Sequence, residues 1–300
     1  MTGHRFHGIY PMLYAFFDEA GKLDRAATER QVEGCISGGV HGLAVGGLAT
    51  ECGKLSNSEK RQLCTWVLKA ADGRVPVSVT ISEATVETQV EMASLAAGEG
   101  AQWVVLQPPP VQGISEEDLI SFFGKVADAS PVPVGIQNAP QFIGIGLSNA
   151  GLIELNKRHS NVSILKAEGD AMYSSGLAED AGGAFALFNG RNGVDLIDTL
   201  QAGFAGVIPS PDATDVQAQI YDLVRAGDEE EAERRFKEIA PLLGFLMLSI
   251  DHLLCYGKRL SARRLGIEDV FDREPGVAPN SFGLETVSFW SERLERLPDG

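Results

Sequence analysis

Short apolar runs alternate with longer amphipathic stretches along most of this chain. Runs such as 103–106 are apolar without polar alternation, which is typical of strands covered on both faces. The stretches between such runs repeat apolar residues every three or four positions, as amphipathic helices do. Asp24 and Ser56 are the predicted N-caps of the first two helices, and Glu59 completes a capping box with Ser56. The predicted strands cover residues 9–17, 42–46, 75–81, 103–107, 132–138, 162–168, 184–189 and 206–210. The predicted helices cover residues 24–37, 56–71, 84–97, 115–129, 148–159, 170–181, 193–202 and 212–226.

The regular alternation predicts an α/β fold. About eight strand–helix units fit into residues 1–226, which favours a (β/α)8 TIM barrel over an open, doubly wound sheet. No G-x-G-x-x-G follows the first strand, so a dinucleotide-binding fold is not indicated. After Gly227 the alternation stops, and residues 227–300 are predicted to form a C-terminal helical extension packed on the barrel. We expect Pro241 to bend or split its first helix, and residues 242–250 to be buried all round, against the barrel first and another subunit second.

Charge and composition narrow the classes of partner. The 300 residues include 25 Lys+Arg against 41 Asp+Glu, and the net charge of −16 argues against nucleic acid or an anionic membrane surface as a partner. The four cysteines form no CxxC pair and no metal-type spacing with the five histidines, so we predict free, mostly buried thiols and no metal site. Residues 1–7 lack an apolar signal core, and no run reaches the roughly 20 apolar residues of a membrane span. We therefore predict a cytoplasmic protein.

The stretch 162–170 carries the strongest candidate for chemistry, because Lys166 and Glu168 lie within and at the end of an apolar strand. Strand side chains alternate faces, so these two side chains are expected to point the same way. In a barrel the carboxyl ends of the strands carry the active site. Burial favours the neutral form of a lysine, which can attack a ketone to form a Schiff base. The alternative is a plain ion pair in which Glu168 keeps Lys166 protonated and inert.

Further candidate residues lie at the ends of the second, fifth, seventh and eighth predicted strands. Those predicted to bind substrate are Ala49, Thr50, Glu51, Gln137, Asn189, Ile208 and Ser210. Glu51 either binds substrate hydroxyls or caps the following turn, and Cys52 beside it is expected to pack. Arg191 either attracts an acid group or is a solvated loop arginine. Asn189 and Ser210 are hydroxyl ligands by position alone.

At these residues the chain resembles the dihydrodipicolinate synthase / N-acetylneuraminate lyase family of Schiff-base lyases over nearly its whole length. The resemblance rests on the order and spacing of Gly8-Ile9-Tyr10-Pro11, Gly47 to Glu51, Asn138-x-Pro140, Lys166, Asn189-Gly190, Gly206-Val207-Ile208 and Lys258 to Gly266. It implies a barrel with a C-terminal helical extension, a homo-oligomer that is a tetramer or a dimer, and an imine between Lys166 and a pyruvate-like 2-oxo acid. Imine chemistry requires no cofactor and no metal.

Three departures from the family pattern bear on the reaction. Gln137 stands where the family usually has a tyrosine that relays protons, and a glutamine cannot titrate. Leu48 and Ala49 replace two threonines that hold the substrate carboxylate in many members, which leaves Thr50 and the backbone N–H groups of residues 49 and 50 for that task. Residues 108–110 are prolines where synthases contribute an aromatic residue.

These departures argue against a dihydrodipicolinate synthase proper and against ordinary aldol cleavage. The glutamine before the Asn-Ala-Pro turn and the K-x-E on strand six look most like the branch that dehydrates 2-keto-3-deoxy sugar acids, notably L-2-keto-3-deoxyarabonate, to 2-oxoglutarate semialdehyde. Glu168 is then the candidate for proton transfer at C3. Alternatives that keep the imine are a pyruvate-dependent aldolase, a synthase or a deaminase on a related 2-oxo or imino acid. An alternative of another class is a non-catalytic small-molecule sensor on the same barrel.

Overall fold

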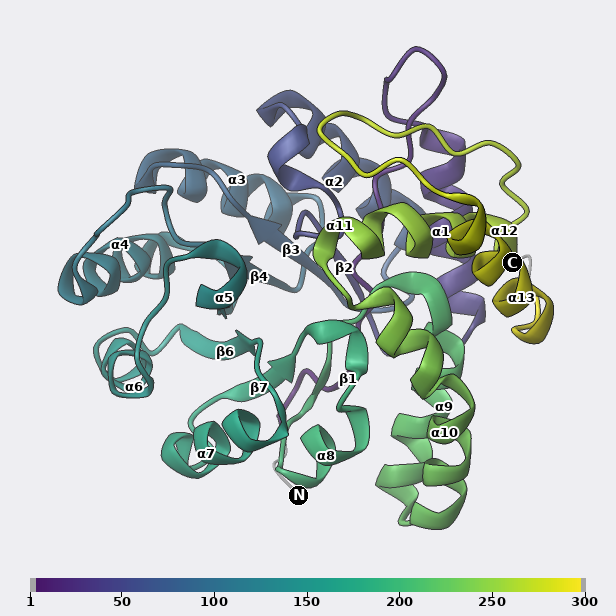
Figure 1. Cartoon of the computed structure of the whole chain (residues 1–300). Coiled ribbons are helices and arrows are strands. Elements are labelled where there is room, and N and C mark those ends of the chain that lie inside the picture. Colours follow the sequence, from purple (N-terminus) through teal and green to yellow (C-terminus); the bar gives the residue numbers. More distant parts are fainter. Residues whose placement is uncertain (1–3, 298–300) are drawn as a thin grey trace.

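The computed structural model describes residues 4–297, which form a barrel of parallel strands with helices around it (Figure 1). The eight strands lie in the order β1-β8-β7-β6-β5-β4-β3-β2. A parallel bridge between Met12 and Ala44 brings the two ends of this order together. The predicted (β/α)8 TIM barrel is therefore confirmed. The strands are β1 (Gly8–Ile9), β2 (Leu43–Val45), β3 (Val77–Ile81), β4 (Trp103–Leu106), β5 (Val134–Asn138), β6 (Val162–Ala167), β7 (Ala186–Asn189) and β8 (Gly206–Val207).

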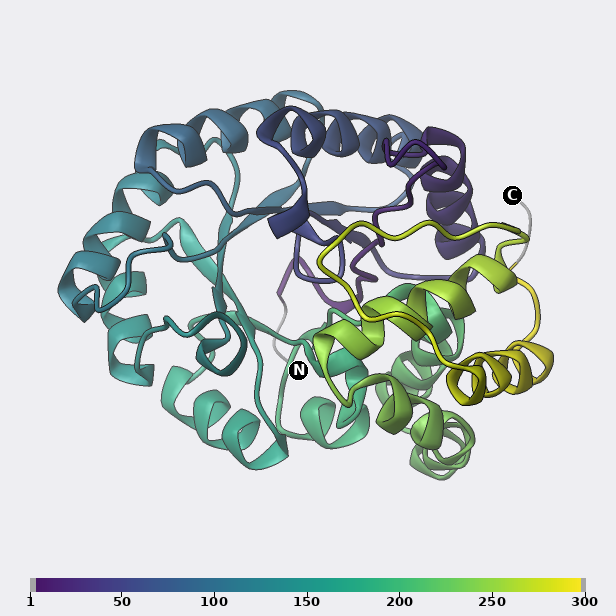
Figure 2. The same ribbon diagram turned by 45° about the horizontal axis from the view of Figure 1, so that its top comes forward.

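Helices form the outer ring of the barrel (Figure 2). Asp24 accepts a hydrogen bond from the N–H of Ala27, and Ser56 forms a reciprocal capping box with Glu59, as predicted. The short helix α5 was not predicted, because four residues carry no periodic pattern. The ring consists of α1 (Arg25–Ser37), α2 (Asn57–Ala71), α3 (Val86–Gly98), α4 (Glu116–Ala129), α6 (Asn149–Arg158), α7 (Ala171–Ala181), α8 (Leu196–Gln201) and α9 (Thr214–Ala226), and α5 (Pro140–Ile143) lies inside it, after β5.

The first strand is much shorter than the predicted 9–17. Gly8 and Ile9 pair with β8 at a point where the backbones are very close, since a Cβ on Gly206 would lie 2.0 Å from the Gly8 carbonyl oxygen. Beyond Ile9 the chain turns to β2, where the Leu13 N–H donates to the Ala44 carbonyl at 2.8 Å. The apolar residues of this run are buried, so the prediction was right about burial and wrong about the extent of regular pairing.

Aromatic side chains fill the interior of the barrel. Trp103 stacks on Phe6 and on Phe188, with ring centroids 5.7 and 5.4 Å apart, and Tyr10 packs edge-on against Trp103 and Phe188. Because Phe188 pairs in register with Lys166 on the neighbouring strand, this layer lies next to the lysine. The aromatic layer therefore closes the interior on one side of Lys166 and leaves the carboxyl ends of the strands as the open side.

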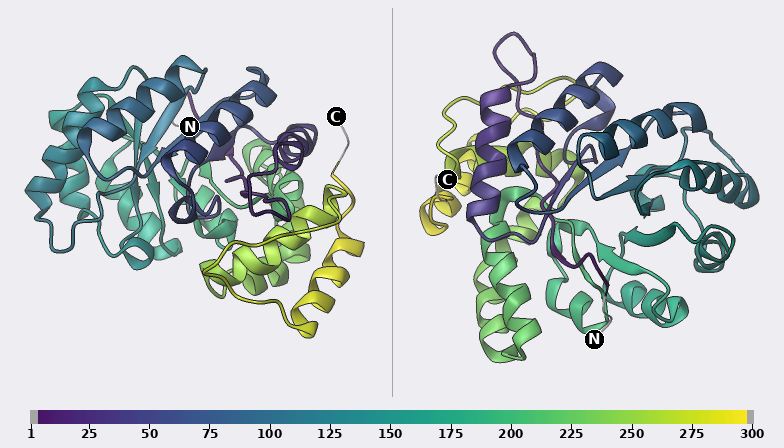
Figure 3. Two further views of the ribbon diagram at one scale, coloured as in Figure 1. Left: turned by 90° about the horizontal axis from the view of Figure 1, so that it is seen from above. Right: turned by 180° about the vertical axis from the view of Figure 1, so that it is seen from behind.

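The chain after Gly227 forms α10 (Glu229–Leu246), α11 (Ile250–His252), a π-helical turn (Leu253–Gly257), α12 (Lys258–Arg264) and α13 (Ser281–Arg293). Figure 3 shows these segments, from green to yellow, gathered on one side of the barrel, and α10 packs along α9. Within residues 4–297, no single helix has the length and hydropathy of a membrane span. Among these residues, α10 and the run Ile250–Arg264 reach that length and hydropathy when they are taken together, but a bend of 107° separates them.

The structure bears on two predictions about the C-terminal helices. Pro241 does not split α10, which continues from Glu229 to Leu246, because the proline lies on the exposed face, where water can bond the carbonyl that it leaves without a donor. α10 ends at Leu246, and Ser249 then caps the start of α11. Within one chain, residues 242–250 are not buried all round, since Leu243 is buried but Leu248 is 71% exposed, and burial against another subunit stays a prediction. The buried side of α10 packs on the barrel helices α8 and α9.

Candidate active site

Lys166 lies on β6 at the mouth of the barrel, where it lines a pocket with several residues from other strand ends. Four of the predicted site residues line this pocket together with it: Glu168, Ala49, Ile208 and Ser210. The C-terminal helices contribute Met247, Ile250 and Leu253 to its wall. The pocket is therefore formed by the barrel and the C-terminal segment together.

Lys166 and Glu168 are in direct contact, as their spacing on one strand face predicts. The Lys166 Nζ donates to Glu168 Oε1 at 2.8 Å, and the two side chains are 6% and 4% exposed. The same Oε1 accepts a second hydrogen bond, from Gln137 Nε2 at 2.9 Å. No residue between 4 and 297 donates a hydrogen bond to the other oxygen, Oε2. Glu168 therefore presents one saturated and one free oxygen, and it lines the pocket beside the lysine.

Gly190, at the end of β7, determines how Glu168 is placed. A Cβ at residue 190 would lie 2.6 Å from Glu168 Cδ and 2.9 Å from its Oε2. A side chain at this position would therefore occupy the space of the carboxylate, and only glycine permits the observed contact. The glycine of the Asn189-Gly190 motif thus leaves the space that the Glu168 carboxylate occupies, a contact that the sequence pattern does not reveal.

The loop that follows β2 places its predicted residues in different directions. Ala49 lines the pocket, whereas the Thr50 hydroxyl is buried in the loop, where it donates to the Leu13 carbonyl at 2.7 Å and accepts from the Gly46 N–H at 3.0 Å. The Thr50 N–H donates to the Gly47 carbonyl. Both groups are thus engaged in holding the loop rather than directed at the pocket.

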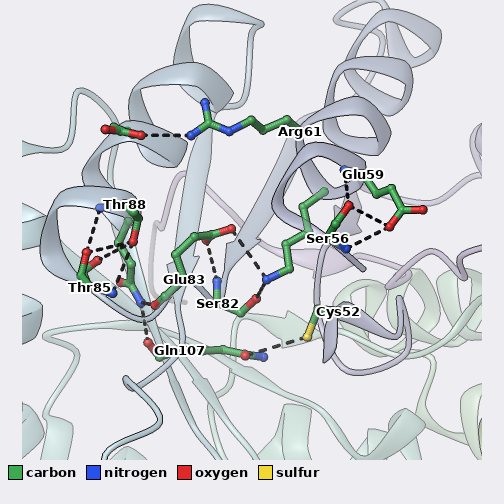
Figure 4. Close-up of polar contacts among 12 residues, drawn as sticks. Cys52, Ser56, Glu59, Arg61, Ser82, Glu83, Thr85, Thr88 and Gln107 are labelled. Carbon is green, nitrogen blue, oxygen red and sulfur yellow. Dashed lines mark hydrogen bonds and ion pairs between the residues drawn. The ribbon is translucent and has the colours of Figure 1, made fainter. Parts of the chain in front are cut away.

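Glu51 is directed away from Lys166. Its backbone is in the left-handed region, with φ of 58°, and its carboxylate binds Lys258 through one oxygen and Lys54 through the other, the latter at 2.7 Å. The Glu51 side chain does not cap the turn that follows, which was one of its two predicted roles, and its carboxylate is instead held by the two lysines. Cys52, the next residue, is buried and its Sγ lies 4.0 Å from Gln107 Oε1, which Figure 4 shows in a cluster of polar side chains.

Asn189 points outward from β7. Its Nδ2 donates to the carbonyl of Gly169 and to the hydroxyls of Ser174 and Thr199 at 3.0 to 3.2 Å. The structure therefore places this side chain between the barrel and the outer helices and not beside Lys166. Its contact with Gly169 holds the segment that follows Glu168.

Ser210 lies in the pocket and is held by residues that the sequence did not indicate. The Asn192 Oδ1 accepts from the backbone N–H of Ser210 at 2.8 Å and from its hydroxyl at 2.7 Å. The hydroxyl also contacts Asp212, which accepts a further hydrogen bond from Tyr14 at 2.9 Å. Burial raises the pKa of the Asp212 carboxyl, and the hydrogen bonds from its neighbours act in the opposite direction. No local pattern could reveal this network, since Tyr14 and Asp212 are 198 positions apart.

A second, larger cleft lies beside the pocket, between the segments that follow β5 and β6. Gln141, Ser148 and Tyr173 line it, and Glu168 and Arg191 line both the cleft and the pocket. Arg191 forms an ion pair with Asp195 at 2.5 Å, so its charge is partly balanced. The two spaces therefore adjoin at Glu168 and Arg191.

Comparison with known proteins identifies the family. Residues 5–268 match the sequence profile of the dihydrodipicolinate synthetase family. The chain belongs to this family. Its members are lyases of the aldolase type, and the chain is accordingly a lyase of that family. The predicted family resemblance is therefore confirmed.

Individual relatives carry different names within the family. The chain is 30% identical to an L-2-keto-3-deoxyarabonate dehydratase from Azospirillum brasilense, over 80% of this chain and 79% of the relative. It is 28% identical to a 4-hydroxy-tetrahydrodipicolinate synthase from Exiguobacterium sibiricum, over 82% of this chain and 84% of the relative. The crystal structure of dihydrodipicolinate synthase from Thermotoga maritima has the same fold, with a TM-score of 0.87, 21% identity, and coverage of 97% of this chain and 100% of that chain.

The described residues provide amine, carboxylate, amide and hydroxyl groups for chemistry. No group of three or more His, Cys, Asp or Glu side chains in residues 4–297 is arranged to hold a metal ion. The arrangement around Lys166 instead combines a buried primary amine with one adjacent carboxylate. That pair can form a carbon–nitrogen bond and transfer a proton at a neighbouring atom.

Proposed function

We propose that the protein forms a Schiff base between Lys166 and a 2-oxo acid and dehydrates a 2-keto-3-deoxy sugar acid. L-2-keto-3-deoxyarabonate is the proposed substrate, and 2-oxoglutarate semialdehyde the proposed product. The observation that carries the proposal is the contact of the Glu168 carboxylate with the Lys166 amine, where Gln137 occupies the position of the usual tyrosine. With a glutamine there, Glu168 is the titratable group beside the lysine that can move a proton.

The reaction can be written with these two residues alone. The neutral Lys166 amine attacks C2 of the substrate and water leaves, which gives an iminium ion. Glu168 removes a proton from C3, and the resulting enamine expels the C4 hydroxyl, which leaves as water when it takes a proton. Loss of one proton from C5 and of the proton of the C5 hydroxyl, balanced by protonation at C4 and C3, then converts the unsaturated iminium to the aldehyde. Hydrolysis of the imine releases the product and restores the amine.

The surroundings of the pair fit this chemistry. Glu168 Oε1 already accepts two N–H donors, so the free Oε2 is the oxygen available for the C3 proton. Ser210 and the backbone near Ala49 line the pocket and can bind the acid group and a hydroxyl of the substrate. The remaining substrate atoms would extend toward Arg191 and the adjoining cleft. The similarity to the dehydratase from Azospirillum brasilense supports the same reaction.

We further propose that the protein acts in the cytoplasm as a homo-oligomer, a tetramer or a dimer, without a cofactor. Light scattering coupled to size-exclusion chromatography measures the mass in solution directly. A mass of 32.0 kDa, that of one chain, would contradict an oligomer.

Trapping of the imine tests the proposed function. The protein is incubated with pyruvate or L-2-keto-3-deoxyarabonate, reduced with borohydride and digested, and the peptide that contains Lys166 is examined by mass spectrometry. We expect a reduced adduct on Lys166 in the native chain and none in Lys166→Met. Lys60→Met is a matched control, because Lys60 is also a poorly exposed lysine paired with a glutamate, Glu83, at 3.7 Å.

The outcome separates the reaction classes. Absence of an adduct under conditions in which the 2-oxo acid binds would contradict every Schiff-base reaction and favour a sensor. If the adduct forms, the products of the sugar acid are identified. Semialdehyde as the main product supports dehydration, whereas released pyruvate identifies an aldolase and released ammonia from an amino or imino acid identifies a deaminase.

A further inference from the structure

A line of buried side chains leads from Glu168 to the opposite side of the barrel mouth. Gln137 Nε2 donates to Glu168 Oε1 at 2.9 Å, and Gln107 Nε2 donates to Gln137 Oε1 at 2.9 Å. The Gln107 Oε1 in turn faces the Cys52 thiol at 4.0 Å, a contact drawn in Figure 4. All four side chains belong to residues that are less than 9% exposed. The four side chains therefore lie in the protein interior, and their contacts are made with one another and not with bulk water.

The direction of every hydrogen bond in this line follows from its two ends. An ionised carboxylate can only accept, so Gln137 must turn its NH2 group toward Glu168. The Gln137 carbonyl oxygen then faces Gln107, which must offer its own NH2 group. The oxygen of Gln107 is left for the Cys52 thiol, a weak donor. Reversing either amide would place two acceptors or two donors against each other, which is costly in a buried site.

Gln107 is itself held firmly at the end of β4. Its backbone N–H donates to the Ile81 carbonyl at 2.9 Å, and its carbonyl accepts from Gln89 Nε2 at 3.0 Å. The fully buried Gln89 also donates to the Glu83 carbonyl at 2.8 Å. The backbone of Gln107 is thus fixed by strand β3 and helix α3, and its amide reaches Gln137 from a defined position. Neither Gln107 nor Gln89 was predicted to belong to the site.

We propose that Gln107 is a positioning residue for proton transfer, which holds the Gln137 amide so that Gln137 donates to Glu168 Oε1 and leaves Oε2 to take the substrate proton. This inference rests on the proposed role of Glu168 in the reaction. A donor on Oε1 stabilises the ionised carboxylate, the form that removes a proton. It also prevents the carboxylate from turning its protonated oxygen away from the pocket.

The substitution Gln107→Glu changes this arrangement with little change in size. An ionised carboxylate at position 107 accepts but does not donate, so Gln137 would reverse its amide and present its oxygen to Glu168. Glu168 would lose a donor and meet a repulsive dipole, and a second negative charge would lie nearby. We expect the acid limb of the kcat/KM profile to move to higher pH and kcat to fall at least about tenfold, the usual scale for one hydrogen bond to a charged group.

Two further variants separate positioning from simple loss of structure. Gln112→Glu introduces the same charge on the exposed loop that follows β4, and its pH profile should match that of the native chain. Gln107→Met has nearly the same volume without a donor, and kcat should fall by up to about tenfold, the scale of a hydrogen bond between neutral groups, with KM little changed. If Gln107→Glu does not fold, the methionine variant and its pH profile decide the matter.

The readouts distinguish failure of this inference from failure of the proposed function. Borohydride trapping of pyruvate on Lys166 should proceed in Gln107→Glu and Gln107→Met as in the native chain, because neither change touches the amine. An adduct in all three proteins together with unchanged kcat and pH profiles would overturn the role of Gln107 alone. Absence of an adduct in the native chain would overturn the proposed function, and with it this inference.

Discussion

Lys258 and Glu51 form a fully buried ion pair that joins the C-terminal helices to the mouth of the barrel. Their side chains are 0% and 1% exposed, and they are 207 positions apart in the sequence. Glu51 ends the loop that carries Ala49 into the pocket, and Lys258 begins α12. The pair therefore fixes the pocket loop against the segment that provides the opposite wall.

Removal of the lysine from this pair should destabilise the protein strongly. In Lys258→Met the buried Glu51 carboxylate keeps only Lys54 as a charged partner, and leaving a buried charge without its partner costs about 3 kcal/mol or more. Urea unfolding at neutral pH measures the free energy of unfolding. Lys237→Met is the control, because Lys237 pairs with Glu233 on the exposed side of α10 and should contribute less than about 1 kcal/mol. An unchanged stability with lost substrate binding would instead place Glu51 in the binding site.

The carboxylate of Glu168 should be required for turnover but not for imine formation. In Glu168→Gln we expect kcat to fall at least about a hundredfold, the usual scale for loss of a general acid or base, with the Lys166 adduct still formed on reduction. Steady-state kinetics and borohydride trapping measure the two effects. Glu83→Gln, which alters another buried carboxylate beside a lysine, should leave turnover within about tenfold of the native value. Native turnover in Glu168→Gln would remove Glu168 from the mechanism.

A methyl group at residue 190 should displace the same carboxylate. Gly190→Ala would place a Cβ 2.6 Å from Glu168 Cδ, so the carboxylate must move away. Because a catalytic group misplaced by about 1 Å can lose about a hundredfold in rate, we expect a decrease in kcat of that size. Gly176→Ala is the control, because no atom lies within 4 Å of its added Cβ. Kinetics and thermal unfolding are compared for both. Full activity in Gly190→Ala would show that the position of Glu168 is not restricted by this contact.

The decrease in the free energy of unfolding at low pH should depend in part on Glu59. A hydrogen bond from Arg273 lowers the pKa of the Glu59 carboxyl from 4.5 to about 2, with Ser56 contributing in the same direction. Because the folded-state pKa is the lower one, the stabilisation is fully present above about pH 4.5 and is lost as the pH falls toward 2. The side chains of Arg273 and Glu59 are 20% and 24% exposed, so we expect about 1 kcal/mol.

Urea unfolding between about pH 5 and about pH 2 tests this expectation. In Glu59→Gln the decrease in the free energy of unfolding over this range should be smaller than in the native chain by about 1 kcal/mol. Glu19→Gln, at an exposed glutamate, should give a curve parallel to that of the native chain. Parallel curves for Glu59→Gln would show that the Arg273 contact does not stabilise the fold.

Local patterns were sufficient for the barrel and for the position of Lys166. Continuous apolar runs identify the strands because both faces of each strand are buried, and capping residues such as Asp24 and Ser56 fix where helices begin. The same reasoning placed Lys166 at the carboxyl end of the sixth strand with Glu168 on its face. Local patterns could not show that the first strand is limited to Gly8–Ile9, because its pairing depends on the close approach of Gly206 on a strand far along the chain.

The sequence by itself determined the family, the order of strands and helices, and the lysine–glutamate pair, because these depend on periodicity and on neighbours two residues apart. Only the tertiary structure decided which polar side chains face the pocket. Thr50, Glu51 and Asn189 are at strand ends, yet their hydrogen-bonding groups are engaged by partners elsewhere in the fold. Gln107 contacts Gln137, which lies 30 residues further along the chain, and Gln137 in turn contacts Glu168. A buried polar group must be paired, and its partner is chosen by proximity in space, which sequence spacing does not encode.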